Sequence, residues 1–167
     1  MMKKIHSNLN VKPFSIIHEN STLNNDMLSC IVWEYLWSWV SRAVYVHALD
    51  ETKVIKLEWA DWRCNIQEEI IYNQVQWLEW SLARVKDWFA PIYWVSPLWK
   101  VLCMARTTPH EESWKKDSDL PKKVPSFLWD VKIDNFWRYK WKFVCHDYST
   151  LYWLMEYSKK MKDITRK

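Results

Sequence analysis

The chain has 167 residues and a formal net charge of +4, with 49% apolar and 26% charged residues. This length is enough for one domain with a hydrophobic core or for two very small lobes, and the composition is that of a soluble globular protein. No apolar run approaches the length of a membrane span, the start does not form a signal-peptide core, and much of the mild positive charge lies in the C-terminal tail. The four cysteines form no Cys-x-x-Cys pair, which indicates buried thiols in a reducing compartment. We therefore expect a cytoplasmic protein that binds neither membranes nor nucleic acid.

The first part of the chain is predicted to be rich in strands. Residues 1–28 are polar and irregular, and they predict a loose N-terminal arm. Apolar and β-branched runs bounded by turn residues then predict three strands, at Ser29–Tyr35, Ala43–Ala48 and Lys53–Glu58.

A helix and a hairpin are predicted next. Over residues 65–88 apolar side chains recur at helical spacing, and Asn65 followed by Glu68 predicts an N-cap with a capping box. Two strands, at Ile92–Val95 and Lys100–Arg106, are expected to pair around a turn that contains proline.

The rest of the chain is predicted to form a second, smaller unit. Residues 107–124 are polar and charged and contain proline, which is typical of a linker or surface loop. A compact segment, a hairpin and a helix are expected to follow, at Phe127–Asn135, Arg138–Cys145 and Thr150–Lys162. The layout is α+β, with a strand-rich unit over residues 29–106 and a reduced unit over residues 125–167.

The sequence contains no glycine and fifteen tryptophans. At the ordinary usage of about 7%, roughly twelve glycines are expected in a chain of this length. Trp99 and Trp141 stand in predicted hairpins where a residue tolerant of positive φ is wanted, and that residue is normally glycine. Because some bacterial lineages and their viruses read UGA as glycine, we hypothesise that many of these positions are glycine in the living protein. The alternative is a chain that is truly rich in tryptophan, and Trp80 and Trp88 do lie at apolar positions of a helical pattern.

The most specific motif is the sequence DVKIDN, from Asp130 to Asn135. It has the form D-[LV]-K-x-x-N and resembles the catalytic loop of the protein kinase family. That resemblance implies that Asp130 accepts the proton of the substrate hydroxyl, while Asn135 binds magnesium. Lys132 would neutralise the transferring phosphoryl group. The alternative is a polar surface turn with this spacing by chance.

A second motif lies at Asp147, twelve residues after the first. The hydrophobic approach to Asp147-Tyr148-Ser149 is similar to the kinase D-F-G element, with Tyr in place of Phe and Ser in place of Gly. The resemblance implies that Asp147 chelates the magnesium ion that bridges the nucleotide phosphates. Alternatively, Asp147 or Ser149 caps a following helix.

Lys56 and the glutamates after it form a third motif. Val54-Ile55-Lys56 resembles the V-A-I-K sequence of the third kinase strand, whose lysine contacts the α- and β-phosphates of ATP. The resemblance implies an ion pair between Lys56 and a glutamate of the following helix, and we favour Glu68 over Glu69. Alternatively, Lys56 is a strand lysine that extends its stem over apolar surface, and Glu68 is a plain capping carboxylate.

Two further stretches are similar to kinase elements. Trp37, Trp39, Arg42 and Val44 fall on the four fixed positions of the glycine-rich loop, G-x-G-x-x-G-x-V. Indoles at the glycine positions would prevent the backbone from folding over phosphates, which fits the recoding hypothesis. Arg42 departs from the pattern but could contact phosphate directly. Met104 lies in the stretch that resembles the fifth strand, which leads to the adenine-binding hinge.

Together these motifs resemble a small, truncated, phage-type kinase-like protein over roughly residues 29–150. The resemblance implies a phosphotransferase that uses Mg-ATP, with an unknown protein or small molecule as acceptor. However, only eighteen residues follow Ser149, which leaves no room for a full helical lobe. One alternative is therefore a catalytically inactive kinase-like module that binds a nucleotide or a protein. Another is a small interaction protein whose motifs arise by chance.

Overall fold

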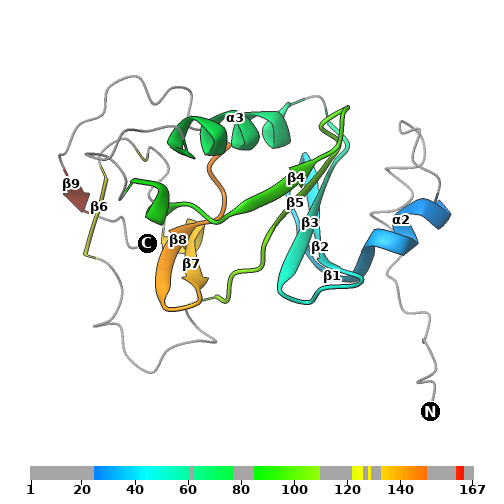
Figure 1. Ribbon diagram of the computed structural model, residues 1–167, viewed down its shortest axis with the longest axis horizontal. Coiled ribbons are helices and arrows are strands. Elements are labelled where there is room, and N and C mark those ends of the chain that lie inside the picture. Colours follow the sequence, from blue (N-terminus) through cyan, green and yellow to red (C-terminus); the bar gives the residue numbers. More distant parts are fainter. Residues whose placement is uncertain are drawn as a thin grey trace, which may run out of the picture.

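The computed structural model describes residues 25–60, 62–76, 85–109, 122–125, 128, 133–149 and 161–163. Over these residues the architecture is α+β (Figure 1). The helical elements are α2 (Asn25–Ile31), α3 (Cys64–Gln76) and two short 3₁₀ turns, η2 (Val85–Trp88) and η4 (Ile133–Asn135). The strands are β1 (Val32–Ser38), β2 (Arg42–His47), β3 (Lys53–Glu58), β4 (Ile92–Val95), β5 (Val101–Ala105), β6 (Lys123–Pro125), β7 (Phe136–Tyr139), β8 (Lys142–Cys145) and β9 (Met161–Asp163).

Five strands form one antiparallel sheet in the order β1-β2-β3-β5-β4. At its centre, Ile55 of β3 lies opposite Tyr45 of β2 on one side and Cys103 of β5 on the other. Helix α3 lies over one face of this sheet, and the β7–β8 hairpin lies beside it (Figure 1). Because successive side chains of a strand point to opposite faces, Val54 and Lys56 share one face while Ile55 points to the other.

Each face of the sheet has its own apolar core. One cluster joins β2, β3 and β5 to α3 and to the β7–β8 hairpin, with members Val44, Val54, Leu102, Met104, Ile71, Val75, Phe136 and Val144. The second cluster joins the opposite face to α2, with members Leu28, Val32, Ala43, Tyr45, Ile55, Leu57, Val101 and Cys103. Lys56 shares its face of the sheet with Val54, a member of the first cluster, and it is buried there. A charge in such apolar surroundings needs a partner of opposite charge.

The strand predictions agree with the structure except at the N-terminal end. Lys53–Glu58 and Ile92–Val95 are confirmed, and β2 and β5 lie within one residue of their expected bounds. The first strand was predicted to begin at Ser29, but the chain is helical through Ile31, so part of the predicted arm belongs to α2. Leu28 explains the difference, because this side chain is 0% exposed and packs on the sheet, which a solvated arm could not do.

The predicted helix over residues 65–88 is correct in its first half. Helix α3 ends at Gln76, residues 77–84 lie outside the described part, and Val85–Trp88 form a 3₁₀ turn. The predicted N-cap, Asn65, is wrong. Glu58 at the end of β3 caps the helix instead, because its two carboxylate oxygens accept the backbone N–H groups of Cys64 and Asn65, each at 2.9 Å.

The two predicted turn tryptophans differ in backbone conformation. Trp99 has a φ of 56°, so a residue with a Cβ occupies the left-handed region that favours glycine, as the sequence predicted. In the β7–β8 hairpin the prediction is wrong by one residue, because Lys140 has the positive φ of 55° and Trp141 does not. Tyr139 pairs with Lys142, so the loop has two residues, Lys140 and Trp141. In a type II′ turn the first loop residue has the positive φ, and here that residue is Lys140.

The C-terminal predictions are mixed. The hairpin is confirmed, although β7 begins at Phe136 rather than Arg138. Two predictions are wrong at their C-terminal ends. The predicted linker over 107–124 runs into strand β6, the predicted helix at Thr150–Lys162 runs into strand β9, and these two strands pair antiparallel. This pairing satisfies backbone groups of both segments and buries Val124 completely. Residues 110–121 and 150–160 lie outside the described part. No described helix has the length and apolar character needed to cross a bilayer.

Candidate functional site

Lys56, in the middle of β3, is buried and fully hydrogen-bonded. Its Nζ lies 3.0 Å from Glu68 Oε1 and 2.9 Å from Glu68 Oε2, and it also donates to the carbonyl oxygen of His146 at 2.7 Å. The ammonium group has three N–H donors, and these three contacts account for all of them. The Lys56 side chain is 1% exposed and that of Glu68 is 0% exposed, so the pair is screened from water.

Arg42, the first residue of β2, extends this ion pair. Its Nη1 lies 3.0 Å from Glu68 Oε1, and its Nη2 lies 2.9 Å from Asp147 Oδ1. Two cations thus face two carboxylates, and the cluster of Lys56, Arg42, Glu68 and Asp147, which we call the buried ionic cluster, has no formal net charge. Such compensation is required because an unpaired buried charge costs several kcal/mol even after relaxation.

Burial and charge pairing shift the pKa values of this cluster in opposite directions. Burial lowers the pKa of Lys56, although Glu68 partly offsets the effect. For Asp147 burial alone would raise the pKa, but Arg42 and Lys56 hold it well below its ordinary value. Asp147 is therefore a carboxylate at neutral pH, which is the form that can bind a cation.

Three contacts hold the Asp147 segment in place. The backbone N–H of His146 donates to the carbonyl of Asn135 at 3.0 Å, which joins this segment to η4. Tyr148 is buried, its ring meets the ring of Phe89 edge to face, and its hydroxyl donates to the carbonyl of Ala90 at 3.1 Å. Tyr148 therefore anchors the segment at the position where the D-F-G element has phenylalanine.

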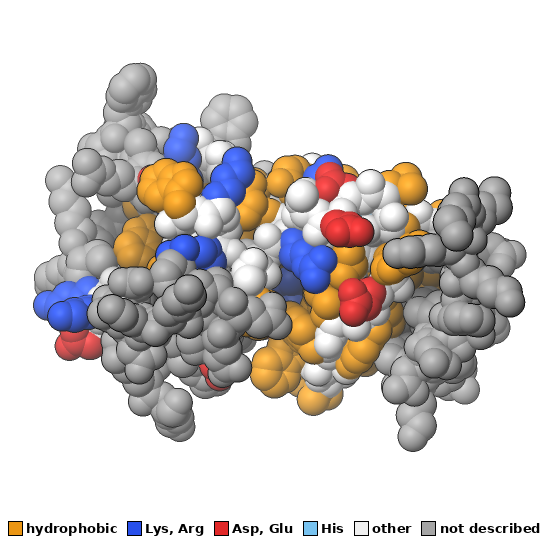
Figure 2. All heavy atoms as spheres, turned by 90° about the horizontal axis from the view of Figure 1, so that it is seen from below, with side chains coloured by type: hydrophobic (Ala, Val, Ile, Leu, Met, Phe, Trp, Pro, Cys, Tyr) orange, Lys and Arg blue, Asp and Glu red, His pale blue; other side chains and the backbone are white. Residues whose placement is uncertain are grey.

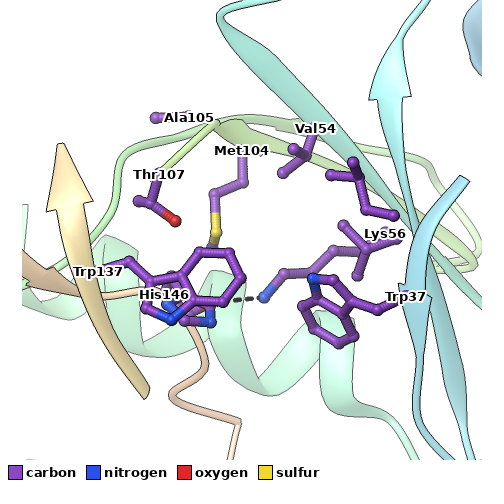
Figure 3. Close-up of a pocket in the computed structure, with 10 residues that line it drawn as sticks. Trp37, Val54, Lys56, Met104, Ala105, Thr107, Trp137 and His146 are labelled. Carbon is purple, nitrogen blue, oxygen red and sulfur yellow. Dashed lines mark hydrogen bonds between the residues drawn. The ribbon is translucent and has the colours of Figure 1, made fainter. Parts of the chain in front are cut away.

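A small pocket lies in front of Lys56 (Figure 3). Its walls come from β1, β2, β3, β5 and β7, and most of them are apolar. The indoles of Trp37 and Trp137 stand on opposite sides, and Lys56 points into the space between them (Figure 3). The lining residues are Leu36, Trp37, Val44, Val54, Lys56, Met104, Ala105, Thr107, Trp137 and His146.

Other ion pairs lie at the surface and are separate from this cluster. Figure 2 shows lysine, arginine, aspartate and glutamate side chains next to one another on the face seen from below. Lys53 lies 3.0 Å from Asp50, and Lys142 lies 2.8 Å from Asp87, with all four side chains at least 30% exposed. Exposed pairs of this kind contribute little to stability, so Lys53 offers a matched control for Lys56 on the same strand.

The structure places the predicted nucleotide-binding residues in two groups. Trp37, Val44, Lys56 and Met104 line the pocket. Arg42 and Glu68 are buried in the ionic cluster and do not line it, so the predicted direct contact of Arg42 with phosphate is not available in this arrangement. Trp39 is 60% exposed and lies outside the lining.

The predicted catalytic and metal residues are described only in part. Asp130 and Lys132 lie outside the described residues. Asn135 is buried, and its carbonyl meets the backbone of His146, so the two predicted metal-binding segments are adjacent. Carboxylate and amide oxygens are suitable magnesium ligands, and Asn135 and Asp147 fit that chemistry. Within the described ranges, no three histidine, cysteine, aspartate or glutamate side chains gather into a metal-binding group.

Several residues of this region were not predicted as part of the site, and Asn65 was predicted only as a helix N-cap. Glu58 and Asn65 fix the start of α3, and Asn65 Nδ2 donates to the carbonyls of Lys56 and Trp99. His146 and Trp137 line the pocket. The available signal was that His146 stands next to Asp147, which the sequence predicted as a metal ligand.

Comparison with known proteins finds no family model that matches the sequence, no curated protein that matches it and no solved structure that matches the fold. The kinase resemblance therefore rests on the motifs and on the geometry described above.

Proposed function

We propose that this chain is a kinase-like protein that binds Mg-ATP and transfers its γ-phosphoryl group to a protein or small-molecule acceptor. The observation that supports this most is the buried ion pair of Lys56 and Glu68 behind an apolar pocket. In protein kinases a strand lysine and a helix glutamate form this pair, and the pair must be in place together with the metal-binding aspartate. Here the same lysine contacts the Asp147 segment through the carbonyl of His146.

Each part of the pocket suits one part of a nucleotide. Flat aromatic and apolar walls favour a nucleobase, and a few polar groups then fix its orientation. Lys56 is the cation for the phosphates. Since all three of its N–H donors are engaged, a phosphate oxygen would take the place of the His146 carbonyl. The ion pair with Glu68 holds the lysine stem in position for that exchange.

Asp130, Lys132, Asn135 and Asp147 complete the proposed reaction centre. Asp130 would accept the proton of the acceptor hydroxyl, and Lys132 would stabilise the charge on the transferring group. Asn135 and Asp147 would hold magnesium, which neutralises phosphate charge when bound. Because Arg42 already contacts Asp147 at 2.9 Å, metal binding requires Asp147 to share or leave this partner.

A second candidate function is nucleotide or protein binding without turnover. The contact of Arg42 with Asp147 favours it, because Arg42 supplies a positive charge where an active kinase holds a metal ion. The two functions differ in whether phosphate is transferred, and both need Lys56 where the ligand is a nucleotide.

The test is ATP binding by calorimetry, with and without magnesium, followed by phosphate transfer to generic acceptors. Lys56→Met should abolish ATP binding, whereas Lys53→Met, at a partly exposed position of the same strand, should leave it unchanged. Since the Trp37 indole forms one wall of this small pocket, Trp37→Gly should strengthen binding by enlarging it. Failure of both the wild-type chain and folded Trp37→Gly protein to bind ATP would leave only an interaction protein.

A further inference from the structure

His146 has a buried side-chain nitrogen without a partner. The residue is 6% exposed, and among the described residues its Nδ1 has no hydrogen-bond partner. Buried polar atoms are nearly always paired, and an unpaired one lowers stability because it has lost its hydration. Such an atom in a ligand pocket calls for an explanation.

The position of the His146 imidazole is fixed from several sides. Its backbone N–H donates to Asn135, and its carbonyl accepts the Lys56 ammonium. The Trp137 ring lies 4.2 Å from the imidazole, measured between ring centroids, and the Trp37 ring lies 6.4 Å away. The ring therefore lines the pocket and lies against the Trp137 indole, with Trp37 farther away (Figure 3).

The chemistry of the ring suits a hydrogen bond to a ligand. A neutral imidazole has one N–H donor and one acceptor nitrogen, and either can serve a ligand hydroxyl. The carbonyl of the same residue contacts Lys56, so the ring lies near the part of the pocket expected to take the sugar and phosphates.

We propose that His146 contacts the ligand directly, and that its Nδ1 makes a hydrogen bond to the sugar–phosphate part of a bound nucleotide. This inference rests on the proposed nucleotide-binding function and adds a residue that selects the ligand. It also explains why this atom has no partner among the described residues, since its partner arrives with the nucleotide.

The test compares His146→Phe with the wild-type chain. Phenylalanine keeps an aromatic ring against the Trp137 indole but removes both nitrogens. ADP affinity should fall about two- to tenfold, the value of one neutral hydrogen bond. The melting temperature without ligand should stay the same or rise, because the substitution removes an unpaired buried atom. A purely structural histidine predicts the opposite, a lower melting temperature.

Two control variants sharpen the experiment. His47→Phe changes a histidine of β2 whose Nδ1 accepts the backbone N–H of Leu49, and it should leave ADP affinity unchanged. His146→Asn keeps a polar atom near the Nδ1 position and should retain more affinity than His146→Phe. An adenosine titration separates the two possible partners, because a loss with ADP alone indicates phosphate and a loss with both indicates ribose.

The outcomes separate this inference from the proposed function. If the wild-type chain binds no nucleotide, the proposed function and the inference about His146 are both overturned. If it binds ADP and His146→Phe binds equally well, the inference alone is overturned and Nδ1 is satisfied by water. A lower melting temperature of ligand-free His146→Phe also overturns it.

Discussion

Arg42 Nη2 lies 2.9 Å from Asp147 Oδ1, and this contact joins two residues that are 105 positions apart in the chain. The guanidinium group also reaches Glu68, so it connects β2, α3 and the segment after β8. No local sequence pattern could produce this arrangement. It is a tertiary contact that holds the five-stranded sheet against the C-terminal hairpin.

Replacement of Arg42 by glutamine should destabilise the protein strongly. Removal of one partner of a buried ion pair leaves an uncompensated charge and costs about 3–5 kcal/mol. Urea unfolding followed by circular dichroism would measure this loss. As a control, Lys53→Gln removes an exposed pair with Asp50 and should leave the midpoint almost unchanged. Equal midpoints for Arg42→Gln and Lys53→Gln would show that the buried ionic cluster does not form.

Replacement of Asp147 by asparagine should remove the magnesium dependence of ATP binding. The substitution keeps the shape of the side chain but deletes the charge that attracts the metal ion. Calorimetry in magnesium and in a chelator would then give the same affinity for the variant and different affinities for the wild-type chain. If the wild-type chain binds ATP equally in both buffers, Asp147 carries no metal in the complex.

Replacement of Asp130 by asparagine should have a different effect. A general base acts on a proton in the transition state, so its loss lowers turnover by roughly 100- to 10,000-fold and leaves nucleotide affinity nearly intact. Phosphate transfer and ATP binding should be measured on the same preparation. An unchanged rate of phosphate transfer in Asp130→Asn would mean that another residue is the base. If the wild-type chain transfers no phosphate, the protein is a binding module rather than an enzyme.

Replacement of Trp99 by glycine should stabilise the protein. Trp99 has a φ of 56°, and a residue with a Cβ pays about 1–2 kcal/mol in this region. Trp141→Gly is the matched control, since Trp141 is exposed and lacks a positive φ, so it should give no gain. Urea midpoints that rank these two variants in the reverse order would contradict the backbone argument.

The coding DNA tests the origin of these tryptophans directly. We expect UGA codons at Trp37, Trp39, Trp99, Trp137 and Trp141. Trp37 and Trp137 stand on the two sides of the pocket, so glycine at both positions would widen it. UGG codons there would mean that the indoles belong to the natural pocket.

Local patterns predicted the central strands, since an apolar run bounded by turn residues defines β3. The pairing of Lys56 with a glutamate of the next helix was implied by the resemblance to kinases, and the structure has Glu68 as the partner. Arg42 was expected at a phosphate, since its burial against Asp147 depends on how distant segments pack. Local pattern also misplaced the start of β1, because the contact of Leu28 with the sheet is long-range.

Glu58 and Asn65 have a further consequence for how this protein can be controlled. Glu58 holds the first two amides of α3, and Asn65 ties the helix to the carbonyls of Lys56 and Trp99. An outward swing of α3 that separated Glu68 from Lys56 would have to break these four hydrogen bonds, of which two are buried and two are partly buried. Any control that moves α3 therefore has to overcome all of these contacts.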